Sequence, residues 1–198
     1  RLDGVDTEGR NSWYAKAQEW ATANSVSDGE NPTGEVTREQ LVTMLYRYAQ
    51  YKGYDVSIGE DTNILSYVDV DQVSDWAMEA FQWACGTGVI EGDENSALTP
   101  KASTTRAQAA AMLMRCYRRY GGAYDAADPS AAMTDWNSVA DWAQADVAAV
   151  LELGVMNGTS ETTFGALGTY TREQAVVTLL RLYANGPVSR SNRNLPAM

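Results

Sequence analysis

Apolar residues recur along this chain at the spacing of amphipathic α-helices, in two kinds of segment that alternate. In one kind, Ala77, Phe81 and Ala84 follow a tryptophan at i, i+4 and i+7 and share one helical face. In the other, Leu41 and Leu45 follow a Thr-Arg pair at the same periodicity. Both patterns predict helices, so we expect an all-α protein. The matching stripes are Ala77, Phe81, Ala84, Cys85; Ala143, Val147, Val150, Leu151; Leu41, Met44, Leu45, Tyr48; Ala109, Met112, Leu113, Cys116; and Ala175, Thr178, Leu179, Leu182.

Four landmarks recur in fixed order three times, and this internal repetition organises the chain. An aspartate is followed seven residues later by a tryptophan, then sixteen residues later by a glycine, and finally by a Thr-Arg-x-Gln segment. They predict unit 1 (1–52), unit 2 (67–120) and unit 3 (133–185), with linkers at 53–66 and 121–132 and a tail at 186–198. The landmarks are Asp6, Asp69, Asp135; Trp13, Trp76, Trp142; Gly29, Gly92, Gly158; and the segments opening at Thr37, Thr105, Thr171.

Each unit is predicted to hold two helices, which we call the tryptophan helix and the capping-box helix. Ser12, Asp75 or Asp141 is placed to cap a helix whose first residue is the tryptophan. Thr37 with Gln40, and its two repeats, have the spacing of a capping box. A two-helix unit cannot bury both apolar stripes alone, so we expect three helical-hairpin repeats to form one compact pseudo-threefold module. The capping-box helices would form its central three-helix bundle.

Composition excludes several kinds of function. The 198 residues include no histidine, which rules out Ser-His-Asp or Cys-His catalysis and histidine-ligated zinc. The net charge of -11 argues against nucleic-acid binding and against attraction to an anionic membrane. The acidic residues form no convergent pair of the kind that glycoside hydrolysis needs. We therefore expect no enzymatic activity in this chain, no catalytic residue, no metal and no cofactor.

The two cysteines and the lack of a long apolar run bear on the compartment. Cys85 and Cys116 lie on facing apolar stripes and could approach each other, but buried free thiols are favoured over a disulfide. No run of about 18 apolar residues is present, so we expect no membrane insertion. If the protein is exported, we expect its signal peptide to lie outside this sequence.

Arginine opens each capping-box helix, and this placement is the strongest pointer to a ligand. A cation at a helix N-terminus opposes the macrodipole at about 0.3–1 kcal/mol, so an anion is expected nearby. A carboxylate of a ligand would suit a bidentate guanidinium, and the N–H groups of the helix start could add an anion site. Alternatively, each arginine pairs with the aspartate of a unit and ties units together. The arginines are Arg38, Arg106 and Arg172.

Three further repeated positions carry open alternatives. The landmark tryptophans could stack on a sugar ring or anchor packing, and we favour partial exposure. The landmark glycines supply positive φ in a turn, or present a backbone N–H to ligand. A late arginine in each capping-box helix is interpreted as complementing the dipole. These late arginines are Arg47, Arg115 and Arg181.

From about residue 5 to 185 the units resemble the S-layer homology (SLH) family. The resemblance rests on an aromatic-x-Asp-Val segment, a Trp-Ala pair, a Gly-hydrophobic-hydrophobic-x-Gly turn and a Thr-Arg motif, in that order. Gln replaces the family's Glu after Thr-Arg-x. Unit 1 also departs at Trp13-Tyr14, Ala23 and Ser25 and has a loop five residues shorter, so its site is the candidate for degeneracy. The motifs are Tyr67-Val68-Asp69-Val70; Trp76-Ala77 and Trp142-Ala143; and Gly88–Gly92 and Gly154–Gly158.

The resemblance implies a non-enzymatic, extracellular module that fixes its protein to the cell wall or S-layer of Gram-positive and related bacteria. Such modules bind secondary cell-wall polysaccharide, often with pyruvylated N-acetylmannosamine, in grooves between adjacent units. The expected ligand-binding residues are the landmark aspartates, tryptophans and glycines with the three helix-opening arginines. Further extracellular domains could be fused to the chain. The alternatives are a helical scaffold that binds protein at the cell surface, or the anchor of a larger extracellular enzyme.

Overall fold

A computed structural model describes residues 13–60, 62–125 and 127–185. Secondary structure in these ranges is helical, with isolated β-bridges and no strand, which confirms the all-α prediction. Asp6 and Ser12 lie outside the described residues. The elements are α1 (Ala15–Ala23), α2 (Arg38–Tyr51), η1 (Val70–Gln72), η2 (Asp75–Ala77), α3 (Met78–Gly86), α4 (Arg106–Arg119), η3 (Trp136–Ser138), α5 (Asp141–Glu152) and α6 (Arg172–Asn185).

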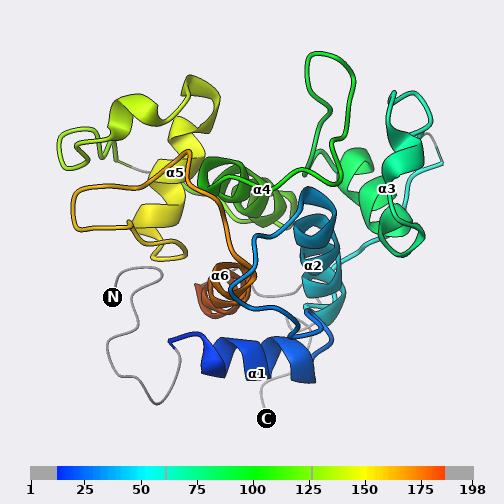
Figure 1. Cartoon of the computed structure of the whole chain (residues 1–198), viewed down its shortest axis with the longest axis horizontal. Coiled ribbons are helices and arrows are strands. Elements are labelled where there is room, and N and C mark those ends of the chain that lie inside the picture. Colours follow the sequence, from blue (N-terminus) through cyan, green and yellow to red (C-terminus); the bar gives the residue numbers. More distant parts are fainter. Residues whose placement is uncertain (1–12, 61, 126, 186–198) are drawn as a thin grey trace, which may run out of the picture.

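The three capping-box helices α2, α4 and α6 gather at the centre of the molecule, with α1, α3 and α5 outside them (Figure 1). Helix α2 packs against both α4 and α6. The apolar stripe of each central helix is buried as its periodicity predicts: Leu41, Leu113 and Leu179 each have no exposed surface. Burial of these stripes supplies most of the driving force for assembly.

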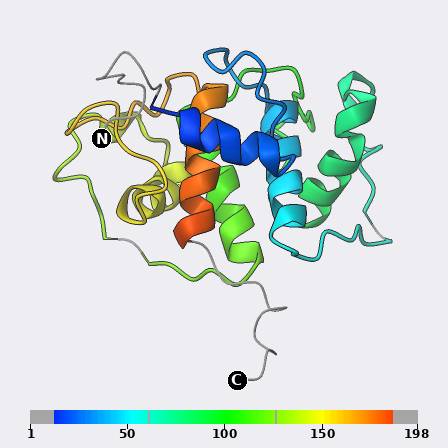
Figure 2. The same ribbon diagram turned by 90° about the horizontal axis from the view of Figure 1, so that it is seen from below.

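The outer helices pair with central helices of a different unit. Helix α3 packs on α2, α5 packs on α4, and α1 packs on α6; Figure 2 shows α1 crossing α6. Each helical hairpin is therefore composite, joining a capping-box helix to the tryptophan helix of the following unit, and α1 with α6 closes the circle. The apolar stripes predicted for one unit are thus covered by its neighbours.

A ring of main-chain hydrogen bonds joins the segments that lead into the three central helices. The N–H of Val36 donates to Tyr170 O at 2.8 Å, that of Tyr170 to Thr104 O at 2.9 Å, and that of Thr104 to Val36 O at 3.0 Å. Each segment thus gives one bond and receives one. This cyclic pattern gives the molecule its approximate threefold symmetry.

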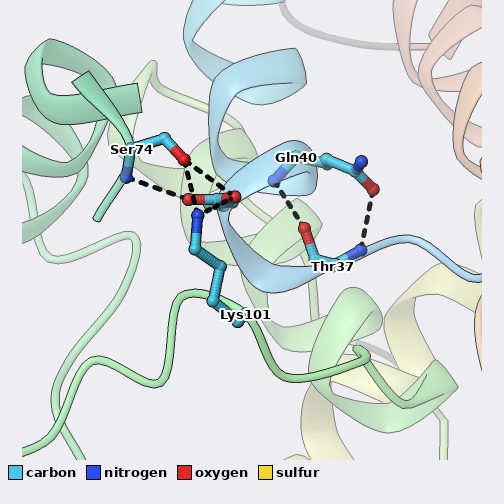
Figure 3. A network of polar contacts seen from close by, with 5 residues as sticks. Thr37, Gln40, Ser74 and Lys101 are labelled. Atoms are coloured by element: carbon cyan, nitrogen blue, oxygen red, sulfur yellow. Dashed lines mark hydrogen bonds and ion pairs between the residues drawn. The ribbon is translucent and has the colours of Figure 1, made fainter. Parts of the chain in front are cut away.

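All three predicted capping boxes are present. The N–H groups of Gln40 and Gln108 donate to the threonine hydroxyls three residues earlier, and the glutamine side chains accept in return. Gln174 does the same with Thr171, at 3.4 and 3.2 Å. Figure 3 shows the reciprocal pair of Thr37 and Gln40. Each threonine cap stabilises its helix by about 1 kcal/mol.

The predicted caps of the tryptophan helices are wrong in the described residues. Asp75 lies in the 3-10 turn η2 and Asp141 is the first residue of α5; neither caps through its side chain. Helix α3 begins only at Met78, after Trp76, because η2 takes the place of its first turn. Acidic residues at these positions still complement the helix dipole.

Both cysteines are free thiols, as the sequence favours. Cys116 is buried in the core, and Cys85 is half-buried against it. Burial raises the pKa of Cys85 to about 11 and that of Cys116 to about 12, so both thiols are protonated at neutral pH.

Candidate functional site

The main-chain N–H groups at the starts of the central helices are already used. The N–H groups of Arg38 and Glu39 donate to Ala102 O and Pro100 O, both at 2.9 Å. The first two N–H groups of α4 and α6 donate in the same way to carbonyls of the neighbouring loops. With the third N–H held by the capping box, these helix starts offer no main-chain anion site. That part of the sequence prediction is wrong, because adjacent loops supply the missing acceptors.

The arginine side chains all reach the residue that precedes a landmark glycine of another unit. Arg38 Nη2 donates to Glu91 O at 2.7 Å, and Arg106 Nη2 donates to Asn157 O at 2.6 Å. Arg172 Nη2 instead donates to a side chain, the Oδ1 of Asp28. The guanidinium groups therefore lie at the three junctions between units.

The landmark aspartates do not pair with these arginines in the described residues. The carboxylate of Asp69 accepts from the N–H groups of Leu98 and Thr99, both at 2.7 Å. Asp135 accepts in the same way from the two N–H groups that begin at Phe164. The alternative of an arginine–aspartate tie within the repeat is therefore wrong for Asp69 and Asp135, which instead brace the long loops leading to α4 and α6.

The Arg38 and Arg172 junctions open into grooves. The Arg38 groove, of about 580 Å³, lies between the start of α2, the loop after α3 and the side of α4, and Trp142 of α5 also lines it. The Arg172 groove, of about 330 Å³, repeats this arrangement with Asp28, α2 and Trp76. The lining residues that correspond by repeat are Arg38, Gln108, Ala111, Met112, Arg115, Trp142 and Arg172, Gln40, Thr43, Met44, Arg47, Trp76.

Each groove carries a second arginine from the side of the capping-box helix. Arg115 lines the Arg38 groove and Arg47 lines the Arg172 groove. The sequence analysis did not predict a role in binding for these two arginines, because a cation late in a helix is already explained by its favourable interaction with the helix dipole. The available signal was spacing: Arg47 follows Gln40 by seven residues, which places both on one face of α2.

Arg106 occupies the third junction and is engaged inside the protein. Its residue surface is 1% exposed. Nε donates to Phe164 O at 3.0 Å, and the guanidinium lies 4.9 Å from the centroid of the Phe164 ring. This conformation does not present the guanidinium to a ligand. Unit 1, the candidate for a degenerate site, contributes Asp28 and Ser27 to the Arg172 groove.

The tryptophans are exposed where they line a groove. Trp76 is 54% exposed and Trp142 is 57% exposed, whereas Trp83, outside the repeat pattern, is 1% exposed in the core. Trp13 is half-buried against the core. Trp76 and Trp142 each lie beside a pair of arginines and provide flat apolar faces on which a ring could stack.

The landmark glycines serve two different needs. Gly29 has φ +78°, as the sequence predicts. Gly92 and Gly158 do not have positive φ, so that interpretation is wrong for them; they are needed for close approach instead. A Cβ on Gly92 would lie 2.4 Å from the Tyr67 ring, and one on Gly158 would lie 2.4 Å from Ser160 O and 2.5 Å from Thr163 O.

The charges in the two grooves are balanced differently. Desolvation lowers the pKa of Arg38, and the nearby Arg115 acts in the same direction, while Cys85, Asp69 and Asp93 act to raise it. In the other groove, burial acts to raise the pKa of Asp28, but the hydrogen bond from Glu30 N–H and the ion pair with Arg172 outweigh it, so the pKa is lowered. Glu91, Asp93 and Glu94 also line the Arg38 groove, so acidic residues lie beside Arg38 and Arg115 there as well.

A buried carboxylate fixes the segment that carries Trp76. Glu39, 5% exposed, accepts from Ser74 N–H at 3.1 Å, from Ser74 Oγ at 3.3 Å and from Lys101 Nζ at 2.7 Å. Figure 3 shows Ser74 and Lys101 converging beside the capping box of α2. Because Ser74 directly precedes η2, this contact orients Trp76 towards its groove.

Within residues 13–60, 62–125 and 127–185, no three His, Cys, Asp or Glu side chains gather closely enough to hold a metal ion. None of the helices in the described ranges combines the length and apolar character that a bilayer crossing needs.

Two stretches of the chain, residues 66–110 and 132–176, match the S-layer homology domain. They coincide with most of units 2 and 3. The chain is also 30% identical over 151 residues to an amylopullulanase of Thermoanaerobacterium thermosulfurigenes, covering 76% of this chain and 8% of that protein. It is 28% identical over 151 residues to exoglucanase XynX of Acetivibrio thermocellus, covering 76% of this chain and 13% of that protein.

A third relative is an endoglucanase of Bacillus sp. (strain KSM-635), 28% identical over 145 residues, which cover 73% of this chain and 14% of that enzyme. The aligned stretch therefore spans only 8–14% of the length of these three relatives. The similarity concerns a small part of much longer proteins.

Proposed function

Because this chain belongs to the S-layer homology family, whose domains anchor proteins to the cell wall, we propose that it binds an anionic cell-wall polysaccharide through its inter-unit grooves. The family membership places the chain at the cell surface. The ligand we propose is a secondary cell-wall polymer that carries a pyruvyl ketal on N-acetylmannosamine. Recognition then depends on close contact, since the net charge of -11 repels an anionic polymer at long range.

The observation that carries the proposal is the pairing of two arginines with an exposed tryptophan in each open groove. Arg38 with Arg115, and Arg172 with Arg47, face a shared cavity that Trp142 or Trp76 also lines. A guanidinium can hold a carboxylate through two parallel hydrogen bonds. The indole face packs against the apolar face of a pyranose ring. One pyruvylated sugar satisfies both elements at once.

The proposal assigns binding to two junctions. The Arg38 groove and the Arg172 groove present their guanidinium groups to a cavity, whereas Arg106 is enclosed and serves to join α4 to the loop before α6. We expect two equivalents of sugar per chain, with the stronger site at Arg38. Arg38 donates to a neutral carbonyl there, while Arg172 already has the carboxylate of Asp28 as a partner.

Binding of the purified chain to cell-wall sacculi, before and after mild acid removal of pyruvyl ketals, tests the proposal. Co-sedimentation should be strong with native sacculi and lost after depyruvylation. The double variant Arg38→Ala, Arg172→Ala should remain helical and lose binding. Binding that survives depyruvylation unchanged rules out the carboxylate–arginine contact. No binding to either preparation favours the scaffold that binds protein.

What the module anchors is a further part of the proposal. The three relatives are glycoside hydrolases by name and extend far beyond the matched region. We propose that this chain is likewise the wall-binding part of a longer extracellular protein and is not itself catalytic. Assay of the isolated chain on pullulan and cellulose should show no hydrolysis, while the full-length protein should sediment with sacculi.

A further inference from the structure

We propose that a second sugar subsite, formed by Asn24, Ser25, Gln50 and Tyr51, continues the Arg172 groove and binds an uncharged sugar of the same polymer chain. This inference rests on the proposed function, because it extends the site that would hold the anionic sugar. It gives the Arg172 groove a preference for polymer over a single sugar.

The subsite is a cavity of about 630 Å³ at the end of α1 and the second half of α2. Ser27, Asp28 and Arg47 line both this cavity and the Arg172 groove. The two spaces therefore share a boundary, and a chain of sugars can pass from one to the other across Arg47.

The lining has the chemistry of a carbohydrate site. Asn24 and Gln50 bring amides, Thr22 and Ser25 bring hydroxyls, and Tyr51 brings an aromatic ring. Amides and hydroxyls can both donate and accept, which matches the hydroxyl groups of a neutral sugar. Arg47 and Asp28 are the charged members and lie at the boundary with the groove.

One face of α2 connects the two spaces. Gln40, Met44 and Arg47 line the groove, and Arg47 and Tyr51 line the cavity. Gln40 and Tyr51 stand eleven residues apart, which is about 16 Å along a helix at 1.5 Å per residue. That length exceeds one sugar ring, so the continuous face fits an oligosaccharide.

The aromatic ring of this cavity is held in place. Tyr51 packs edge-on against Trp20 at 5.7 Å between ring centroids, and at 5.4 Å against Tyr183 of α6. It is nevertheless 37% exposed. A ring fixed by its neighbours and open on one side is a preorganised platform for a sugar, which limits the entropy lost on binding.

Ser25 provides an independent argument. Its φ is +58°, a left-handed conformation that side chains rarely adopt, and the equivalent positions in the other units are Gly88 and Gly154. The turn itself needs no serine: Ser25 N–H donates to Thr22 O at 3.1 Å, as Gly88 N–H donates to Cys85 O at 3.2 Å. Non-glycine residues in this conformation concentrate at functional sites. Ser25 places a hydroxyl-bearing side chain among the residues that line the cavity, where the other units have glycine.

Isothermal titration with two probes tests the subsite. The first probe is the monosaccharide 4,6-pyruvyl-N-acetylmannosamine, and the second is purified wall polysaccharide that carries it. The substitution Arg38→Ala first removes binding at the Arg38 groove, so that the titration reports on the Arg172 groove. In that background, Ser25→Gly and Gln50→Ala should each weaken polymer binding about three- to ten-fold and leave monosaccharide affinity unchanged.

Thermal unfolding separates binding from folding. Ser25→Gly should unfold at the same or a higher temperature than the parent, because glycine relieves the backbone conformation. Arg172→Ala should remove binding of both probes. Unchanged polymer affinity in both subsite variants, or equal losses for the two probes, overturns the subsite alone. If the unmodified chain binds neither probe, the proposed function fails and the subsite fails with it.

Discussion

Arg172 donates from Nη2 to the carboxylate of Asp28, whereas Arg38 donates from the equivalent position to the main-chain carbonyl of Glu91. The direct partner of Nη2 is therefore a carboxylate at one junction and a neutral carbonyl at the other, although Glu91, Asp93 and Glu94 also line the Arg38 groove. At Arg38 a ligand carboxylate meets guanidinium donors that no carboxylate in the described part of the chain holds directly, whereas at Arg172 it must compete with Asp28.

Substitution of that carboxylate should strengthen the Arg172 site. In Asp28→Asn the side-chain oxygen still accepts from Arg172, but the charge is gone. Because an exposed ion pair contributes about 0.2–1 kcal/mol, affinity for the pyruvylated sugar should rise up to about five-fold. Calorimetry in the Arg38→Ala background measures it. A fall in affinity would mean that Asp28 helps to bind the ligand instead.

Substitution of the groove arginine Arg38 should affect binding, whereas substitution of the enclosed Arg106 should affect stability. Arg38→Ala should reduce sugar affinity about ten- to hundred-fold, the range for charge-assisted hydrogen bonds, with a small change in unfolding free energy. Arg106→Ala should destabilise the fold by about 3 kcal/mol, because it leaves the Phe164 and Asn157 carbonyls without their donor. Denaturant unfolding and titration on both variants decide this. The reverse pattern would contradict the assignment.

The exposed tryptophans should matter for binding only. Trp76→Ala and Trp142→Ala remove side chains that are 54% and 57% exposed, so the unfolding free energy should change by less than about 1 kcal/mol while sugar affinity falls. Trp83→Ala is the matched control: its side chain is buried and donates to Tyr120 Oη at 3.0 Å. That variant should lose about 3–5 kcal/mol of stability. Equal destabilisation of all three would show that the exposed tryptophans are packing residues.

Gly158 and Gly92 should differ in their tolerance of alanine. A methyl group on Gly158 meets the main-chain oxygens of Ser160 and Thr163, which cannot move without disturbing the loop. On Gly92 the nearest atoms belong to the Tyr67 ring, a side chain that can rotate. Gly158→Ala should therefore lower the melting temperature more than Gly92→Ala. Identical melting temperatures would contradict the close-contact explanation.

The stability of the folded protein should not change with pH near neutrality and should fall in alkali. No histidine is present to titrate between about pH 6 and 8. Burial raises the pKa of Cys85 to about 11 and of Cys116 to about 12; burial and the hydrogen bond to Glu79 raise that of Tyr46 to about 12. Their neutral forms are favoured in the folded state.

These groups therefore contribute full stability below their unfolded pKa values of 9 to 10, and lose it as pH rises through 11 to 12. Denaturant midpoints should be flat from pH 6 to 8 and should fall above pH 9. Iodoacetamide should leave both thiols unmodified in the folded protein at pH 8. Rapid alkylation there would contradict their burial.

Local sequence signals predicted the elements well. Periodicity located the buried faces of the helices, and the Thr-x-x-Gln spacing located all three capping boxes. Such features depend on residues within one or two helical turns, which a sequence displays directly. The same signals placed the arginines at the helix starts, where the structure has them.

The caps of the tryptophan helices and the φ of Gly92 and Gly158 are local errors, and the remaining errors concern partners distant in sequence. Nothing in the sequence near Asp69 indicates that its carboxylate accepts hydrogen bonds from the N–H groups of Leu98 and Thr99, about thirty residues away. Likewise, the pairing of α1 with α6 joins opposite ends of the chain. The enclosure of Arg106 depends on Phe164, which occupies another unit. These relationships arise only when the units assemble.

The circular arrangement fixes how many units the module can hold. In an open solenoid each end can accept another repeat, but here α1 already covers α6 and the hydrogen bonds of Val36, Thr104 and Tyr170 return to their starting point. A fourth unit has no free edge to join, and a chain with two leaves one edge bare. Longer tandem arrays of this unit would therefore have to grow in multiples of three, as separate closed rings.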